Sequence, residues 1–78
     1  MTSSKPIQYT QTEILRKATY NALLLIKLYN IKRNIGALLN LTDRIIHEHT
    51  CEHTYYTIDQ TKEILALAES KIRDYLDH

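Results

Sequence analysis

The most apolar stretch of the chain runs from Ala22 to Ile31, where only Lys27 and Asn30 interrupt the apolar residues. The stretch contains no Gly, Pro or turn signal, so it predicts a helix. A helix that is apolar on nearly every side needs neighbours on more than one side. A short chain supplies only some of them, so we expect this helix to meet a partner.

Two stripes of apolar residues at helical spacing overlap in this stretch. The first stripe consists of Ile14, Ala18, Ala22, Leu25 and Tyr29. The second consists of Leu24, Leu28, Ile31, Ile35, Leu38 and Ile45, with Thr42 in step. Steps of four and three alternate in the second stripe, as in a heptad repeat. At about 100° per residue the two stripes lie about a quarter-turn or more apart, so they face different neighbours.

The pattern predicts one long helix over residues 10–49, after a flexible N-terminal lead-in at residues 1–9 that contains Pro6. Thr10 and Glu13 have the spacing of a capping box at its start. A continuous helix of this length is about 60 Å long. Gly36 leaves open a kink or short break between Asn34 and Asp43, because Gly weakens a helix interior.

A second helix is predicted over residues 58–77, after a loop at residues 50–57 without helical periodicity. Thr57 and Gln60 form another potential capping box. The apolar face of this helix consists of Ile64, Leu65, Ala68, Ile72, Tyr75 and Leu76. At about 30 Å it covers only half of the first helix.

These elements predict an all-α fold, an antiparallel helical hairpin forming one domain over residues 10–78. The second helix would cover the second stripe, which leaves the first stripe free to join two copies into a homodimeric helical bundle. The alternative is a kinked first helix that folds into a compact three-helix monomer and satisfies both stripes internally.

The composition supports a small cytoplasmic protein. One Gly and one Pro among 78 residues favour helices over sheets and loops. The single cysteine, Cys51, cannot form an intrachain disulfide, which favours a reducing compartment. The longest apolar run is too short for a membrane span, and the N-terminus has no signal-peptide pattern, so we expect no membrane association.

Charge is divided unequally along the chain. Residues 1–46 carry seven cations and two acids, a net charge of +5, whereas residues 47–78 carry three cations and seven acids, a net charge of −4. Cations that could contact a nucleic acid are Arg16, Lys17, Lys27, Lys32 and Arg33. They scatter around the helix instead of lining one side, so a solvated helix surface is the competing interpretation.

Potential metal ligands are concentrated at the end of the first predicted helix. They are His47, His49, Cys51 and His53. Imidazole and thiolate groups suit zinc. The competing interpretation is a polar helix end that runs into a solvated loop, so no cofactor is expected unless this cluster binds zinc.

The most consistent function is that of a small, non-enzymatic protein–protein interaction module: an adaptor, regulator, inhibitor or assembly factor. We expect self-association or partner docking through Ile14, Ala18, Ala22, Leu25 and Tyr29. A nucleic-acid-binding regulator and a small metal-binding protein are the alternatives. No enzymatic activity is expected, because the chain shows no paired carboxylates, phosphate-binding Gly-rich loop or nucleophile–base set.

Overall fold

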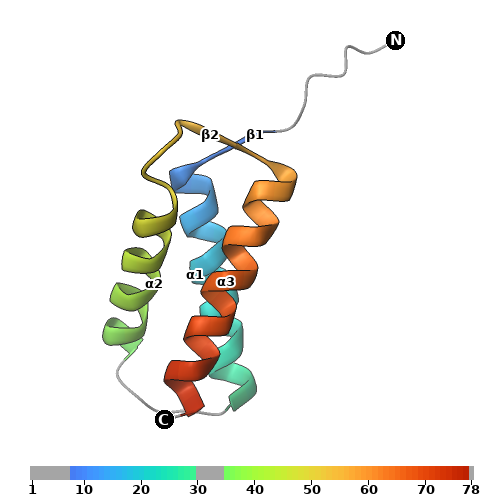
Figure 1. Ribbon diagram of the computed structural model, residues 1–78. Helices are drawn as coiled ribbons and strands as arrows, with labels where there is room; N and C mark the ends of the chain where they lie inside the picture. Colours follow the sequence, from blue (N-terminus) through green and yellow to red (C-terminus); the bar gives the residue numbers. More distant parts are fainter. Residues whose placement is uncertain (1–7, 30–34, 78) are drawn as a thin grey trace.

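The computed structural model describes residues 8–29 and 35–77 as three helices and two short strands (Figure 1). The elements, in chain order, are β1 (Gln8–Thr10), α1 (Gln11–Tyr29), α2 (Ile35–His49), β2 (Tyr55–Thr57) and α3 (Ile58–Asp77). Each helix packs against both of the others, and successive helices run in opposite directions along the bundle (Figure 1). The prediction of a mostly helical fold is therefore confirmed.

The predicted long helix is wrong, because its two halves are separate helices that pack against each other. The helix α1 ends at Tyr29 and α2 begins at Ile35, the two run in opposite directions, and Gly36 lies in the first turn of α2 rather than at a kink. The part of the second stripe that follows Gly36, at Leu38, Thr42 and Ile45, belongs to the buried face of α2. The three-helix arrangement takes the place of the predicted hairpin.

The core is built from one face of each helix, with Tyr56 of β2 at one end. Its buried apolar residues are Ile14, Ala18, Ala22, Leu25, Leu38, Ile45, Ile46, Tyr56, Ala68, Ile72 and Leu76. The first stripe, expected to face a second chain, therefore supplies the contribution of α1 to the chain's own core, with Tyr29 half-buried beside it. The interface predicted at Ile14, Ala18, Ala22, Leu25 and Tyr29 needs these side chains on the surface. The helices α2 and α3 cover them instead.

The second helix predicted at 58–77 is confirmed as α3, and both capping boxes form. Thr10 N–H donates to Glu13 Oε1 over 3.0 Å, and Glu13 N–H donates back to Thr10 Oγ1 over 3.3 Å. The pair Thr57 and Gln60 does the same at the start of α3, over 2.9 and 3.1 Å. Reciprocal bonds of this kind satisfy amides that the first turn leaves without partners.

The two strands were not predicted. β1 pairs antiparallel with β2, with Tyr9 opposite Tyr56, so part of the expected lead-in and part of the expected loop form a small sheet. Each strand ends at the threonine that caps the following helix. The sheet therefore places the first turns of α1 and α3 side by side at one end of the bundle (Figure 1).

Candidate functional site

The side of α1 that faces away from the core carries several large apolar side chains. Leu28 is 76% exposed, Tyr20 64%, and Leu23 and Leu24 each a little over 40%. We call the surface formed by Arg16, Tyr20, Leu23, Leu24, Lys27 and Leu28 the outer face of α1. The expectation that Leu24 and Leu28 of the second stripe would face the last helix is thus wrong.

The N-terminal part of α1 carries a depression that lies beside this face and overlaps it at Arg16, Tyr20 and Leu23. This depression of about 440 Å³ is lined entirely by α1, at Thr12, Leu15, Arg16, Thr19, Tyr20 and Leu23. Because Leu15, Tyr20 and Leu23 make its lining largely apolar, an apolar side chain from another molecule fits it. The sequence signalled this surface: α1 is apolar on more sides than one bundle can bury.

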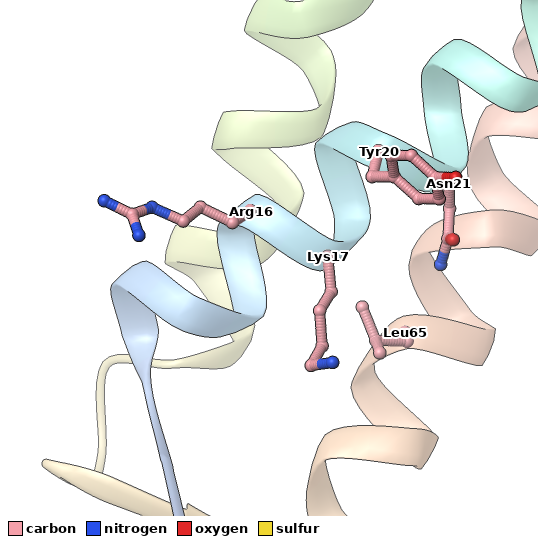
Figure 2. A pocket seen from close by; sticks show the side chains of 5 residues that line it. All are labelled: Arg16, Lys17, Tyr20, Asn21 and Leu65. Carbon is pink, nitrogen blue, oxygen red and sulfur yellow. The ribbon is translucent and has the colours of Figure 1, made fainter.

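A second hollow lies on the surface between α1 and α3. Arg16, Lys17, Tyr20, Asn21 and Leu65 line its volume of about 370 Å³. Figure 2 shows Lys17 and Asn21 pointing from α1 toward α3, where Leu65 lies, whereas Arg16 extends away from them. The Lys17 ammonium lies 5.3 Å from the centre of the Tyr9 ring, a distance typical of a cation–π contact.

The five cations predicted as a nucleic-acid surface do not form one patch in the described part of the chain. Arg16 and Lys17 are adjacent near the start of α1, and Lys27 lies in its last turn. Lys32 and Arg33 lie outside the described residues. Sequence reasoning missed Lys62 of α3, which the fold places near Lys17 at a further cavity.

The four potential metal ligands are held apart by contacts of their own. His47 Nδ1 lies 2.9 Å from the Asp43 carbonyl oxygen, and Cys51 Sγ donates to the Glu48 carbonyl oxygen over 3.6 Å. The His53 ring packs edge-on against Tyr56, with their centres 5.6 Å apart. His49 Nε2 is buried without a hydrogen-bond partner among the described residues. Residues 8–29 and 35–77 hold no group of three or more side chains placed to bind a metal ion.

The charges around the first turn of α1 act on Glu13. The Thr10 backbone N–H and then its hydroxyl donate to this carboxylate, and together with Arg16 and Lys17 they lower the pKa of Glu13. Hydrogen bonds that favour the charged form explain the direction of this shift. The Glu13 carboxylate therefore serves as part of the helix cap, where it accepts hydrogen bonds from Thr10.

Comparison of the chain with models of known families, with curated proteins and with solved structures finds no match. The described helices are each too short or too polar to cross a membrane.

Proposed function

We propose that the protein is a small non-enzymatic interaction module that associates with a second copy of itself through the outer face of α1. The carrying observation is the set of exposed large apolar side chains on that face, above all Leu24 and Leu28. Exposed apolar surface of this kind is typical of interaction sites. The predicted homodimer of antiparallel first helices is kept, but on the opposite side of the helix.

The spacing of the apolar residues favours a second copy as the occupant. Tyr20, Leu24 and Leu28 follow one another at intervals of four, with Leu24 in the middle. A two-fold axis at Leu24 places Leu24 against its own copy and Tyr20 against Leu28 of the other chain. Interfaces between identical chains related by a two-fold axis must be self-complementary in this way.

The charges on this face agree with that register. In the antiparallel arrangement about Leu24, Lys27 lies opposite position 21, which is Asn21 and not a cation. Arg16 and Lys17 lie beyond the central contact, where water screens the repulsion between the cations of the two chains. The centre of the contact is then apolar and its flanks are polar, as in most protein interfaces.

The test is the mass of the protein in solution, measured by light scattering for the wild type and two matched variants. Leu24→Asp removes the centre of the proposed contact and brings two carboxylates together. Leu67→Asp makes the same change at a leucine of α3 whose exposed fraction is 41%, against 42% for Leu24. Leu67 lies about 160° around α3 from Leu65, which faces α1, so it is remote from the proposed contact.

We expect the wild type and Leu67→Asp to be dimers. Leu24→Asp should weaken dimerisation by at least about 30-fold, the effect of losing a hot-spot residue of about 2 kcal/mol. Circular dichroism must show the same helix content in both variants. A wild type that stays monomeric, or a Leu24→Asp variant that dimerises normally, would contradict the proposal.

Nucleic-acid binding, the alternative from the basic first half, is distinguished by salt. Binding to phosphates weakens steeply as salt rises. Self-association through an apolar contact flanked by cations does not weaken, because salt screens the repulsion between like charges.

A further inference from the structure

A small cavity lies where β1 meets the first turns of α1 and α3. Its volume is about 170 Å³, and it is lined by Tyr9, Lys17, Ile58, Thr61, Lys62 and Leu65. It adjoins the larger hollow of Figure 2, with which it shares Lys17 and Leu65.

The lining of the two hollows is cationic. Lys17 and Lys62 line the small cavity, and Arg16 lines the larger hollow, although its side chain extends away from Lys17 (Figure 2). None of the described lining residues is acidic, and these three cations make no salt bridge within the described part of the chain. The nearby carboxylate of Glu13 is held by Thr10 in the helix cap, and hydrogen bonds from Thr10, with smaller contributions from Arg16 and Lys17, lower the pKa of Glu13. Cations beside a cavity attract an anion.

A buried hydroxyl without a partner lines the same cavity. Thr61 is only 3% exposed, and its Oγ1 makes no hydrogen bond within residues 8–29 and 35–77. The comparable buried threonine of α2, Thr42, donates its hydroxyl to the Leu38 carbonyl oxygen over 2.9 Å. Buried polar groups normally form hydrogen bonds, so the hydroxyl of Thr61 is free to bond to a ligand in the cavity. Threonine has two accessible χ1 rotamers in a helix, and rotation between them redirects the hydroxyl.

The sheet fixes one of the two lysines. The pairing of Tyr9 with Tyr56 anchors Tyr9 to β2, and the Tyr9 ring lies 5.3 Å from the Lys17 ammonium. Tyr56 is itself part of the buried core. Lys17 is thus held at the cavity before any ligand arrives, which reduces the entropy lost on binding.

We propose that this cavity, which we call the phosphate cavity, binds the phosphate group of a small phosphate monoester. The ammonium groups of Lys17 and Lys62 neutralise the phosphate, and the Thr61 hydroxyl donates to one of its oxygens. The organic part of the ligand lies over Leu65 in the larger hollow, beside the side-chain amide of Asn21. Hydrogen bonds from hydroxyl and ammonium groups to a phosphate are charge-assisted, and such bonds are stronger than those between neutral groups. The cavity that holds the phosphate shares no lining residue with the outer face of α1, whereas the larger hollow shares Arg16 and Tyr20 with it.

The test is titration of the isotope-labelled protein with AMP, with inorganic phosphate and with adenosine, followed by NMR. We expect saturable AMP binding with a dissociation constant of about 1 mM or lower. Inorganic phosphate should shift the same resonances more weakly, and adenosine should not shift them. An adenosine response equal to that of AMP, or no saturable response to AMP, would overturn the proposal.

Lysine variants separate a built site from general attraction by positive charge. Lys17→Gln and Lys62→Gln should each weaken AMP binding about tenfold, as expected for the loss of one charge-assisted hydrogen bond. Lys27→Gln and Lys71→Gln remove one cation from the same two helices outside the cavity and should leave binding unchanged. Equal losses in all four variants would mean that the protein attracts phosphate without a site.

Thr61→Val tests where the phosphate lies. It removes only the hydroxyl from a side chain of the same shape and should weaken AMP binding several-fold while the protein stays folded. Unchanged AMP binding in this variant would exclude the phosphate cavity as the site of the phosphate.

Discussion

At the scale of single residues, the polar threonines have separate tasks that the sequence reveals only in part. The caps at Thr10 and Thr57 were predictable because a capping box is a local pattern of four residues. The burial of Thr61 was not, since it depends on how β1 and α1 come together with α3. Thr50 is similar: it accepts a hydrogen bond of 2.8 Å from Gln11 Nε2, which is 39 positions away in the chain.

The unpaired hydroxyl of Thr61 predicts an unusual effect on stability. Thr61→Val should raise the free energy of unfolding by about 1 kcal/mol in the absence of ligand, because it removes an unsatisfied buried polar group. For a domain of this size that corresponds to a rise in melting temperature of about 4–8 °C. Thermal unfolding followed by circular dichroism measures the change.

Thr42→Val is the matched control for this effect. It also removes a buried helical hydroxyl, but one that already bonds to the Leu38 carbonyl oxygen. It should be neutral or slightly destabilising. A lower melting temperature for Thr61→Val than for the wild type would show that its hydroxyl has a partner in the folded chain.

At the scale of elements, the two ends of the first predicted helix were right and its middle was wrong. The start at the Thr10 cap and the end at His49 agree with the bounds of α1 and α2. No Gly or Pro separates the two helices in the sequence, and the second stripe continues in phase, so local signals favoured a continuous helix. Tertiary packing decides the matter: two shorter helices bury Ile14 and Ile46 together in one core.

The position of the outer face of α1 was also not predictable from local sequence signals alone. The sequence indicated that α1 is apolar on two sides, but not which side the rest of the chain covers. In the structure α2 and α3 cover Ala18 and Ala22, whose small side chains allow close packing. The larger Leu24 and Leu28 remain outside. The phosphate cavity had no signal in the sequence, because its lining comes from β1, α1 and α3.

The cap of α1 makes its start sensitive to acid. Because hydrogen bonds from Thr10 lower the pKa of Glu13, the cap stabilises the folded state fully only above the ordinary pKa of Glu, about 4.3. The stabilisation is lost as the pH falls through the lowered pKa of the folded state. Melting temperatures measured across this range should fall further for the wild type than for Glu13→Gln, whose side chain does not titrate.

The cap of α3 shows that a glutamine can take the place of the glutamate in the cap of α1. Gln60 fills the same role with an uncharged side chain, so the cap of α3 does not depend on pH. Equal acid sensitivity in the wild type and in Glu13→Gln would contradict the importance of the Glu13 charge.

At the scale of the whole molecule, a chain of 78 residues closes a core with three helices and a two-stranded sheet, yet leaves one side of α1 uncovered. Domains this small bury a modest fraction of their surface, and association with a further chain is one way in which such domains gain stability. The proposed dimer gives the exposed leucines of α1 that role.

The most direct test of this account is cross-linking at the proposed two-fold axis. Leu24→Cys is made together with Cys51→Ser, because Cys51 is exposed and would form disulfides of its own. Since an axial residue meets its own copy, mild oxidation should convert most of this variant into a disulfide-linked dimer. Such a bond requires the two Cα atoms to approach within about 7 Å.

Leu67→Cys with Cys51→Ser, the control at a leucine of equal exposure, should remain largely uncross-linked under the same conditions. A non-reducing gel of both variants gives the answer. Rapid and nearly complete cross-linking at position 24 alone is the predicted result. Equal cross-linking at both positions, or none at position 24, would contradict the claim that the outer face of α1 joins two copies of the chain.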